Sequence, residues 1–266
     1  MSRTATLPGY IICTQPRSGS SAICAALRTS KALGNPIERF NRKTATRFLE
    51  LQANPTDLRS YIRKVIYEPG CHAGVVASKV FWFQLQWITK LLAPQLTLAE
   101  AFNCLFEVCG PLKVIRLIRQ DKLRQAISYV TASRSGIWRA TDSQAAAQMV
   151  SPAPTLENLQ EINYWYERLQ AWEREWDALL IDANAASLTI YYEEIVHDIA
   201  KGAEAIAQCV GLDPNRLALL RLRSPLCRLS PAGADDLVAA FQAWRAQRCV
   251  DGGHVSARPS RPNARM

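Results

Sequence analysis

The chain has 266 residues, 48% of them hydrophobic, and carries a formal net charge of +9. So many apolar residues exclude global disorder, and the length allows one large α/β domain or two small ones. The charge suits an anionic ligand, a nucleic acid or an anionic membrane surface, although a solubilising surface charge is the simpler interpretation.

The strand and helix patterns alternate along the chain. Apolar runs predict buried strands at 9–14, 74–82, 111–120 and 187–195. Helical patterns fall at 20–30, 44–53, 56–67, directly after 82, and at 96–109, 121–133, 156–180, 199–211 and 233–247. This order predicts an α/β fold of the P-loop type, with a central parallel sheet flanked by helices on both faces.

The remaining segments suggest a single domain. We expect it to cover residues 1–250, with a mobile loop at 139–155 and a disordered basic tail at 251–266. The aromatic stripe of the helix at 156–180 favours core or dimer packing. The eight cysteines have neither C-x-x-C pairs nor zinc-like spacing, and the N-terminus lacks a signal-peptide core. We therefore expect a cytoplasmic protein with reduced thiols, without a membrane span.

The stretch CTQPRSGSS, residues 13–21, joins the first strand to the first helix and looks like a phosphate-binding loop. It lacks the Gly-Lys-Ser/Thr ending of nucleotide hydrolases. Gly19 lets the backbone approach an anion, and the N-terminus of the following helix favours negative charge. Arg17 can fork onto phosphate or sulfate oxygens, and Ser18, Ser20 and Ser21 add hydroxyl donors. The loop predicts anion binding, with a serine-rich helix cap as the alternative.

A second anion site is suggested where the third predicted strand ends. Arg119 lies at the end of that strand, and Ser128 lies about two turns into the next helix. An arginine and a serine so placed could hold a second phosphate, but each alone is also an ordinary surface residue.

These segments together resemble the sulfotransferases that use 3′-phosphoadenosine 5′-phosphosulfate, whose marks are a P-[KR]-S-G-[ST]-[ST] loop, an Arg with a downstream Ser, and a Y-E-[DE]-[LI] strand end. Here they read PRSGSS, RQDKLRQAIS and YYEEI. The chain resembles most the bacterial trehalose 2-sulfotransferase family, over roughly residues 8–245. GNPIERF stands where that family has G-x-P-x-E-F-F, so Arg39 replaces its first Phe. SKVFWFQ stands where it has G-K-x-[MW]-W-x-Q, and its C-terminal motif is degraded to RLSPAGADDLV.

The resemblance implies a role for each matching residue. Glu38 would be the general base, Arg17 would stabilise the leaving phosphate, and Arg119 with Ser128 would bind the 3′-phosphate. Lys79 would meet substrate or sulfate, or pair with an acid structurally. Trp82 and Trp138 would stack on a sugar or adenine ring, or belong to the core. The acceptor would be trehalose, another saccharide or a glycolipid, the protein a homodimer, and no metal would be needed.

Other functions remain open from the sequence. A nucleotide kinase would need the Gly-Lys-Ser/Thr loop and acidic Mg²⁺ ligands, and neither is evident. A nucleic-acid-binding protein would suit the charge, but we expect no nucleic-acid partner. A pseudoenzyme would bind the nucleotide without transferring sulfate, and peripheral contact with an anionic membrane is also compatible with the charge.

Overall fold

The computed structural model describes residues 7–51, 57–139, 141, 149–214, 222–226 and 232–250, without the side chains of the last two. Contacts within the chain divide it into two compact units. The first consists of Met1–Ile118 and Glu173–Ser224, and the second of Arg119–Trp172 and Pro225–Met266. The single domain expected over 1–250 stays a prediction, and the tail at 251–266 lies outside the described residues.

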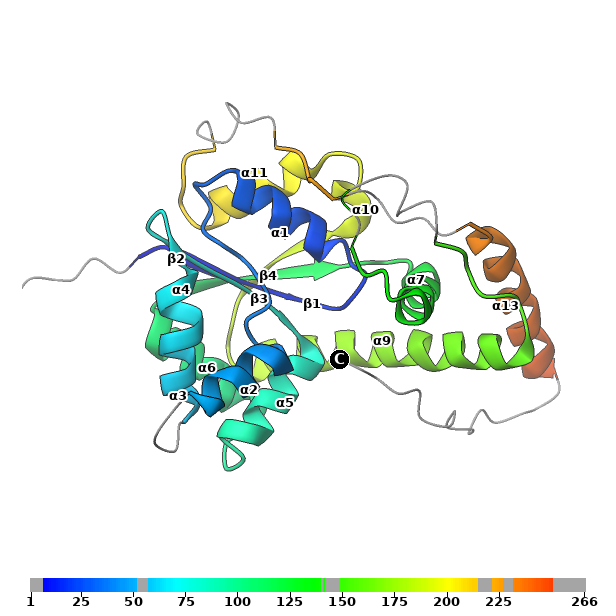
Figure 1. Ribbon diagram of the computed structural model, residues 1–266, viewed down its shortest axis with the longest axis horizontal. Helices are drawn as coiled ribbons and strands as arrows, with labels where there is room; N and C mark the ends of the chain where they lie inside the picture. The colour runs from blue at the N-terminus through cyan, green and yellow to red at the C-terminus, as the bar shows by residue number, and fades with distance from the viewer. Residues whose placement is uncertain are drawn as a thin grey trace, which may run out of the picture. The chain divides into compact units, whose positions relative to one another are not determined.

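The first unit contains a five-stranded sheet (Figure 1). Its order is β2 (Cys71–His72), β3 (Val75–Phe81), β1 (Gly9–Thr14), β4 (Leu112–Ile118) and β5 (Ser187–Tyr191). All neighbours pair in parallel except β2, which runs antiparallel to β3. The chain leaves central β1 toward β3 on one side and later returns to β4 on the other. The carboxyl end of β1 is therefore a switch point, where open α/β sheets bind ligands.

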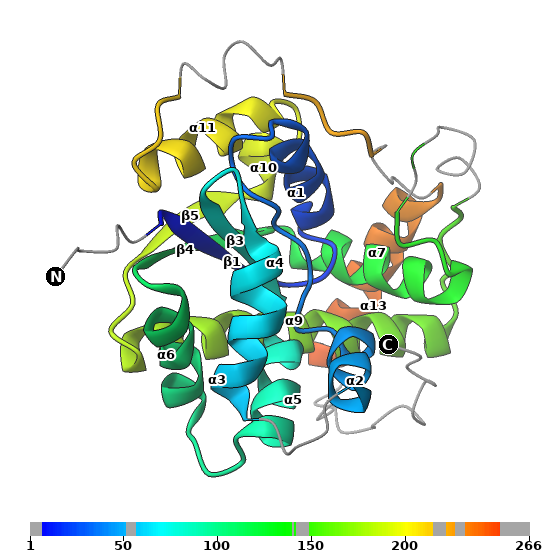
Figure 2. The same ribbon diagram turned by 60° about the vertical axis from the view of Figure 1, so that its left-hand side comes forward.

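Helices cover both faces of this sheet. The helices of the first unit are α1 (Ser20–Thr29), α2 (Arg42–Glu50), α3 (Leu58–Tyr61), the π-helix η1 (Ile62–Tyr67), α4 (Glu68–Gly70), α5 (Trp82–Leu92), α6 (Leu98–Cys109), α10 (Tyr192–Ile195), α11 (Ile199–Cys209) and the C-terminal part of α9 (Leu156–Asp182). Figures 1 and 2 show α1, α10 and α11 on one face, and α3, α5 and α6 on the other. The predicted α/β class is confirmed.

The core forms where alternate residues of the strands meet these helices. On the side of α1 and α11, Tyr10 and Ile12 of β1 pack with Ile23 and Leu27 of α1 and with Ile206 of α11. Side chains alternate along a strand, so Tyr10 and Ile12 share one face. All five are at most 1% exposed. This packing fixes α1, and with it the loop that precedes α1, over the end of β1.

In the part of the second unit that the structure describes there are three helical segments: α7 (Lys122–Ser135), the N-terminal part of α9 and α13 (Ala234–Val250). Aromatic contacts hold them together, with ring centroids 4.0 Å apart for Tyr129 and Trp165 and 5.9 Å apart for Tyr166 and Phe241. The long helix predicted at 156–180 is confirmed, and its stripe packs within the protein.

The structure corrects the sequence prediction in two places. The last predicted strand, 187–195, ends at Tyr191, because residues 192–195 turn into α10. The two-residue edge strand β2 was not predicted, since its pattern is too short to read. Most of the loop predicted at 139–155, namely residues 140 and 142–148, lies outside the described residues. None of the described helices is both long and apolar enough to cross a membrane.

Candidate active site

The loop between β1 and α1 has an unusual backbone. Arg17 has a φ of 64° and Gly19 a φ of 78°, so both adopt the left-handed conformation. For Arg17 this conformation is strained, and such strain gathers at ligand sites. Gly19 is the N-cap of α1, and no side chain caps it in the described structure. The first N–H groups of α1 are thus placed to receive an anion.

A tyrosine of the late YYEEI segment packs directly on Gly19. A Cβ atom built on Gly19 would lie 2.6 Å from Cδ2 of Tyr192, far inside van der Waals contact. Position 19 therefore needs glycine for two reasons, its positive φ and the ring above it. The loop and the end of β5 form one assembly, although they are 173 residues apart in the sequence.

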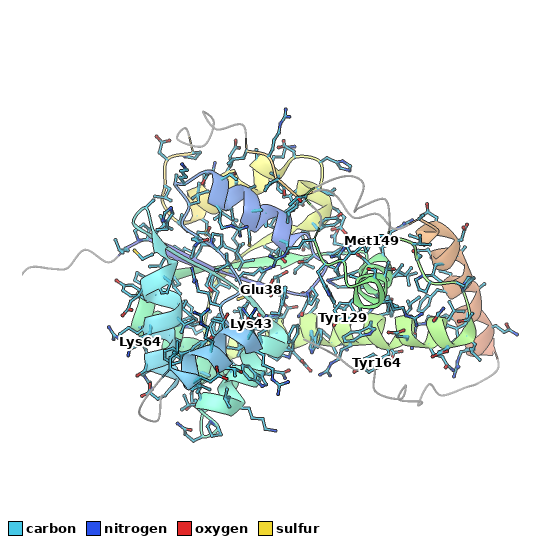
Figure 3. The ribbon with its side chains drawn as sticks, in the orientation of Figure 1. Glu38, Lys43, Lys64, Tyr129, Met149 and Tyr164 are labelled. Atoms are coloured by element: carbon cyan, nitrogen blue, oxygen red, sulfur yellow. The ribbon has the colours of Figure 1, made fainter. Side chains whose placement is uncertain are left out.

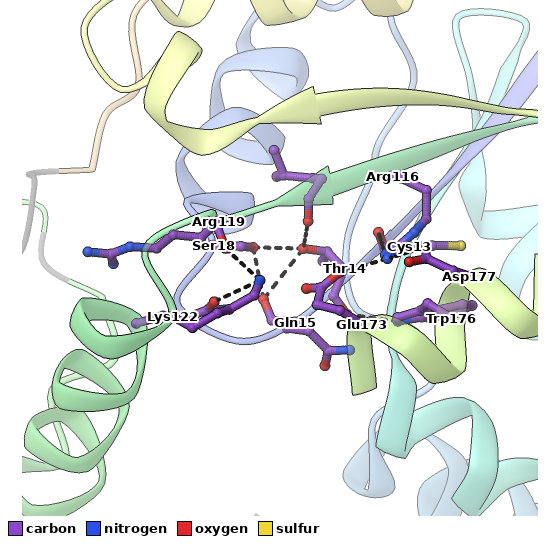
Figure 4. Close-up of polar contacts among 12 residues, drawn as sticks. Cys13, Thr14, Gln15, Ser18, Arg116, Arg119, Lys122, Glu173, Trp176 and Asp177 are labelled. Carbon is purple, nitrogen blue, oxygen red and sulfur yellow. Dashed lines mark hydrogen bonds and ion pairs between the residues drawn. The ribbon is translucent and has the colours of Figure 1, made fainter. Parts of the chain in front are cut away.

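Hydroxyl groups hold the loop from within (Figure 4). Oγ1 of Thr14 donates to the carbonyl oxygen of Leu117 at 2.6 Å and lies 2.7 Å from Oγ of Ser18. Ser18, only 1% exposed, donates in turn to the carbonyl oxygen of Gln15 at 2.8 Å. Its hydroxyl thus shapes the loop. Ligand binding by Ser18 stays a prediction, and the backbone N–H of Ser18 is the group that could donate to a ligand.

A buried charge cluster supports the end of β1 from the opposite side (Figure 4). Arg116 donates to the carbonyl oxygen of Cys13 at 3.3 Å and pairs with Glu173 at 2.7 Å and Asp177 at 3.1 Å. Nε1 of Trp176 donates to the carbonyl oxygen of Thr14 at 3.3 Å. The last two residues of β1 are therefore held by α9 and β4 just before the loop begins.

Lys79 of β3 lies beneath the first turn of α1 and is 1% exposed. Its Nζ is 2.7 Å from Oε1 of Glu38 and 3.4 Å from Oγ of Ser20, the first residue of α1. The ammonium also lies 4.8 Å from the ring centroid of Phe81. Lys79 therefore joins the candidate base to the predicted anion-binding loop.

Glu38 is held by its backbone and by a neighbouring amide. Residues 38 and 79 form a parallel β-bridge, and the N–H of Lys79 donates to the carbonyl oxygen of Ile37 at 3.0 Å. Asn41, the N-cap of α2, donates to the carbonyl oxygen of Glu38. Nε2 of Gln84 donates to Oε2 of Glu38 at 3.3 Å. The carboxylate, whose side chain is 21% exposed, is fixed but open to solvent (Figure 3).

Arg39, which stands where the resembled family has phenylalanine, points away from this cluster. Its guanidinium donates to the carbonyl oxygen of Pro69 at 2.8 Å, and burial lowers its pKa. Tyr61 donates to the backbone carbonyl of Arg39. The arginine therefore anchors the segment that carries Glu38 onto α4.

Gln15 is a polar side chain that the sequence analysis left aside. It is 0% exposed, and neither amide atom has a hydrogen-bond partner among the described residues. A buried amide without partners is costly and rare in proteins. Gln15 lies where the loop leaves β1, and a buried polar group without a protein partner at that place is expected of a site that binds a polar ligand.

The predicted 3′-phosphate residues both lie in the second unit. Arg119 directly follows β4, and its carbonyl oxygen accepts from Nζ of Lys122. Asp121 caps α7, since its Oδ1 accepts from the N–H of Arg124 at 2.8 Å. Ser128 is 5% exposed within α7. The role of Arg119 and Ser128 in binding phosphate stays a prediction.

The two candidate tryptophans have different surroundings. Trp82 is 4% exposed and packs edge-on against Trp176 at 5.1 Å, so it is a core residue of the first unit. Trp138 is 39% exposed and rests edge-on against Tyr129 at 5.4 Å. Figure 3 labels Tyr129 on α7. Of the two, only Trp138 is exposed to solvent.

The structure thus brings Ser20, Lys79 and Glu38 into one cluster next to Gly19, and it places Arg17 and Ser21, both partly exposed, on the same loop. Sequence reasoning did not assign Tyr192 to the loop or Gln84 to Glu38. The position of Gln84 in the SKVFWFQ segment was the available signal. Across the described residues, no group of three or more His, Cys, Asp and Glu side chains could hold a metal ion.

Three comparisons with known proteins address the family of the chain. No curated protein sequence matches the chain. A sulfotransferase from Alicyclobacillus acidocaldarius, known from a crystal structure, is 14% identical, with 96% of this chain and 98% of that chain covered. The TM-score is 0.45, and we draw nothing from that likeness. The family model described as Stf0 sulphotransferase matches residues 9–244. Because the match spans most of the 266 residues, the chain belongs to the Stf0 sulphotransferase family.

Proposed function

We propose that this protein transfers a sulfuryl group from 3′-phosphoadenosine 5′-phosphosulfate to a hydroxyl of a carbohydrate. The acceptor is trehalose, another saccharide or the sugar of a glycolipid. The observation that carries the proposal is the cluster of Ser20, Lys79 and Glu38, which sets a carboxylate beside an anion-binding loop. Membership of the Stf0 family supports sulfuryl transfer as the class of reaction.

The loop fits a phosphosulfate in its chemistry. The uncapped N-terminus of α1 offers N–H donors and a favourable dipole, and Arg17 adds a cation that is always charged. The unpartnered amide of Gln15 is a further polar group available to a ligand. Arg119 and Ser128 are our proposed ligands for the 3′-phosphate.

Glu38 supplies the general base. The acceptor oxygen forms a bond to sulfur while the bond from sulfur to the phosphate oxygen breaks, and adenosine 3′,5′-bisphosphate leaves. Glu38 takes the hydroxyl proton, a contribution of about 10²–10⁴ in rate. Its Oε2 is steadied by Gln84, and Lys79 and Arg17 offset negative charge near the transferred group. Trp138 is our proposed stacking surface for the acceptor sugar.

The first experiment measures binding of adenosine 3′,5′-bisphosphate by calorimetry. We expect tight binding by the intact protein and its loss in Arg17→Ala. Arg47→Ala, at an exposed position of α2, is the matched control and should bind normally. If the intact protein does not bind the bisphosphate, the proposed donor is wrong.

The second experiment measures transfer of labelled sulfate to a panel of saccharides and glycolipids. Glu38→Gln should keep nucleotide binding and lose about 10²–10⁴ in turnover. Glu204→Gln, at an exposed position of α11, is the control and should turn over normally. Full turnover by Glu38→Gln would exclude Glu38 as the base. Nucleotide binding without transfer to any acceptor would instead identify a nucleotide-binding pseudoenzyme.

A further inference from the structure

Lys79 contacts both the candidate base and the first residue of α1. Its buried Nζ is 2.7 Å from Glu38 and 3.4 Å from the hydroxyl of Ser20, at the point where the loop enters α1. A lysine ammonium has three donors. Here one is used in a close ion pair and another in a long, weak contact with the anion-binding loop.

A buried ammonium needs compensating charge, and it is drawn to the nearest anion. In the structure that anion is Glu38. A sulfuryl group bound at the N-terminus of α1 would bring new negative charge next to Ser20. The ammonium would then have a second strong partner on the side of Ser20, where the described contact is the hydroxyl of that serine.

Glu38 does not depend on Lys79 alone. Gln84 donates to its other carboxylate oxygen at 3.3 Å, and Oε1 of Gln84 accepts from the N–H of Phe81 at 3.1 Å. The backbone of Glu38 is fixed by its bridge to β3 and by Asn41. The carboxylate can therefore keep its place when the ammonium moves.

We propose that Lys79 exchanges partners on donor binding. It rests on Glu38 when the loop is empty and turns to the sulfuryl oxygens when the loop is filled, which releases the carboxylate to receive the acceptor proton. This inference rests on the proposed function. The base is thus freed only when the donor is in place, and Lys79 touches the transferred group.

The test compares two ligands that differ in the sulfuryl group, 3′-phosphoadenosine 5′-phosphosulfate and adenosine 3′,5′-bisphosphate. Calorimetry without acceptor gives the dissociation constant of each. Lys79→Met should weaken binding of the phosphosulfate about tenfold and change that of the bisphosphate by less than about twofold, within the usual range of couplings between contacting groups. Lys90→Met, at an exposed position of α5, is the control and should change neither constant.

The decisive variant is Glu38→Gln, which removes the competitor for the ammonium and keeps the side-chain shape. It should strengthen phosphosulfate binding about threefold while Lys79 is present, and this gain should vanish in the Glu38→Gln/Lys79→Met double variant. Glu38→Gln keeps Lys79 in place, so the test does not depend on whether Lys79→Met folds.

Two results would overturn the exchange. One is an equal gain for both ligands, and the other is a gain that persists in the double variant, since either reflects a general charge effect. A failure of the intact protein to bind either ligand would refute the proposed function itself. A protein that binds both ligands but shows no gain from Glu38→Gln would refute only the exchange.

Discussion

Replacement of Gly19 by alanine tests the geometry of the loop most directly. The substitution places a side chain at a φ of 78°, which costs about 1–2 kcal/mol for a residue with a Cβ atom. The new Cβ would also lie 2.6 Å from Cδ2 of Tyr192, so the ring or the loop must move. Together these effects should lower the free energy of unfolding by about 2–4 kcal/mol.

Urea unfolding followed by tryptophan fluorescence measures this loss. Gly211→Ala is the matched control, because Gly211 has a φ of 75° but no described residue within 4 Å of an added Cβ. It should show the backbone cost alone, about 1–2 kcal/mol. In a Tyr192→Ala background, Gly19→Ala should cost no more than this control. If Gly19→Ala costs no more than Gly211→Ala in the parent protein, the packing of Tyr192 on the loop is refuted.

Further predictions concern the buried charges and thiols. Arg116→Met leaves the buried carboxylate of Glu173 without its guanidinium and should cost about 3–5 kcal/mol in urea unfolding. Asp177→Asn should cost less than about 1 kcal/mol, since that side chain is 63% exposed, and a larger loss would contradict the difference in burial. Burial raises the pKa of Cys13 to about 12, so this thiol stays protonated at pH 8. Alkylation read by mass spectrometry should label the partly exposed Cys71 and spare Cys13 in the folded protein, and early labelling of Cys13 would refute its burial.

The sequence predicts the main parallel strands and most helices because their signals are local. The run GYIICT is apolar throughout and buried throughout as β1. The turn of residues 192–195 into α10 escaped prediction because YYEEI continues a strand-like pattern. Tyr192 in this turn packs on Gly19, a contact between distant segments that no local pattern encodes.

The residues of the loop could be predicted as site residues because the loop has a recognisable sequence motif. The roles of other residues depend on tertiary packing and were harder to predict. Lys79 could be interpreted from sequence as a substrate contact or a structural pair, and the structure shows the pair with Glu38. Ser18 looks like a ligand hydroxyl in sequence, but its hydroxyl is bound within the loop. Trp82 looks like Trp138 in sequence, and only packing against Trp176 makes it a core residue.

The pair of Lys79 and Glu38 is better explained by function than by stability. A buried ion pair is seldom more stabilising than apolar side chains of similar volume, because both charges must leave water. The cluster around Arg116 has a structural purpose, since it holds two carbonyl groups at the end of β1. Among the described residues, the side chain of Lys79 holds no such backbone group; its contacts there are a carboxylate, a ring face and the hydroxyl of Ser20. A charge kept at that cost beside the predicted anion-binding loop fits the proposed function, in which an anion bound at the loop takes part in the reaction.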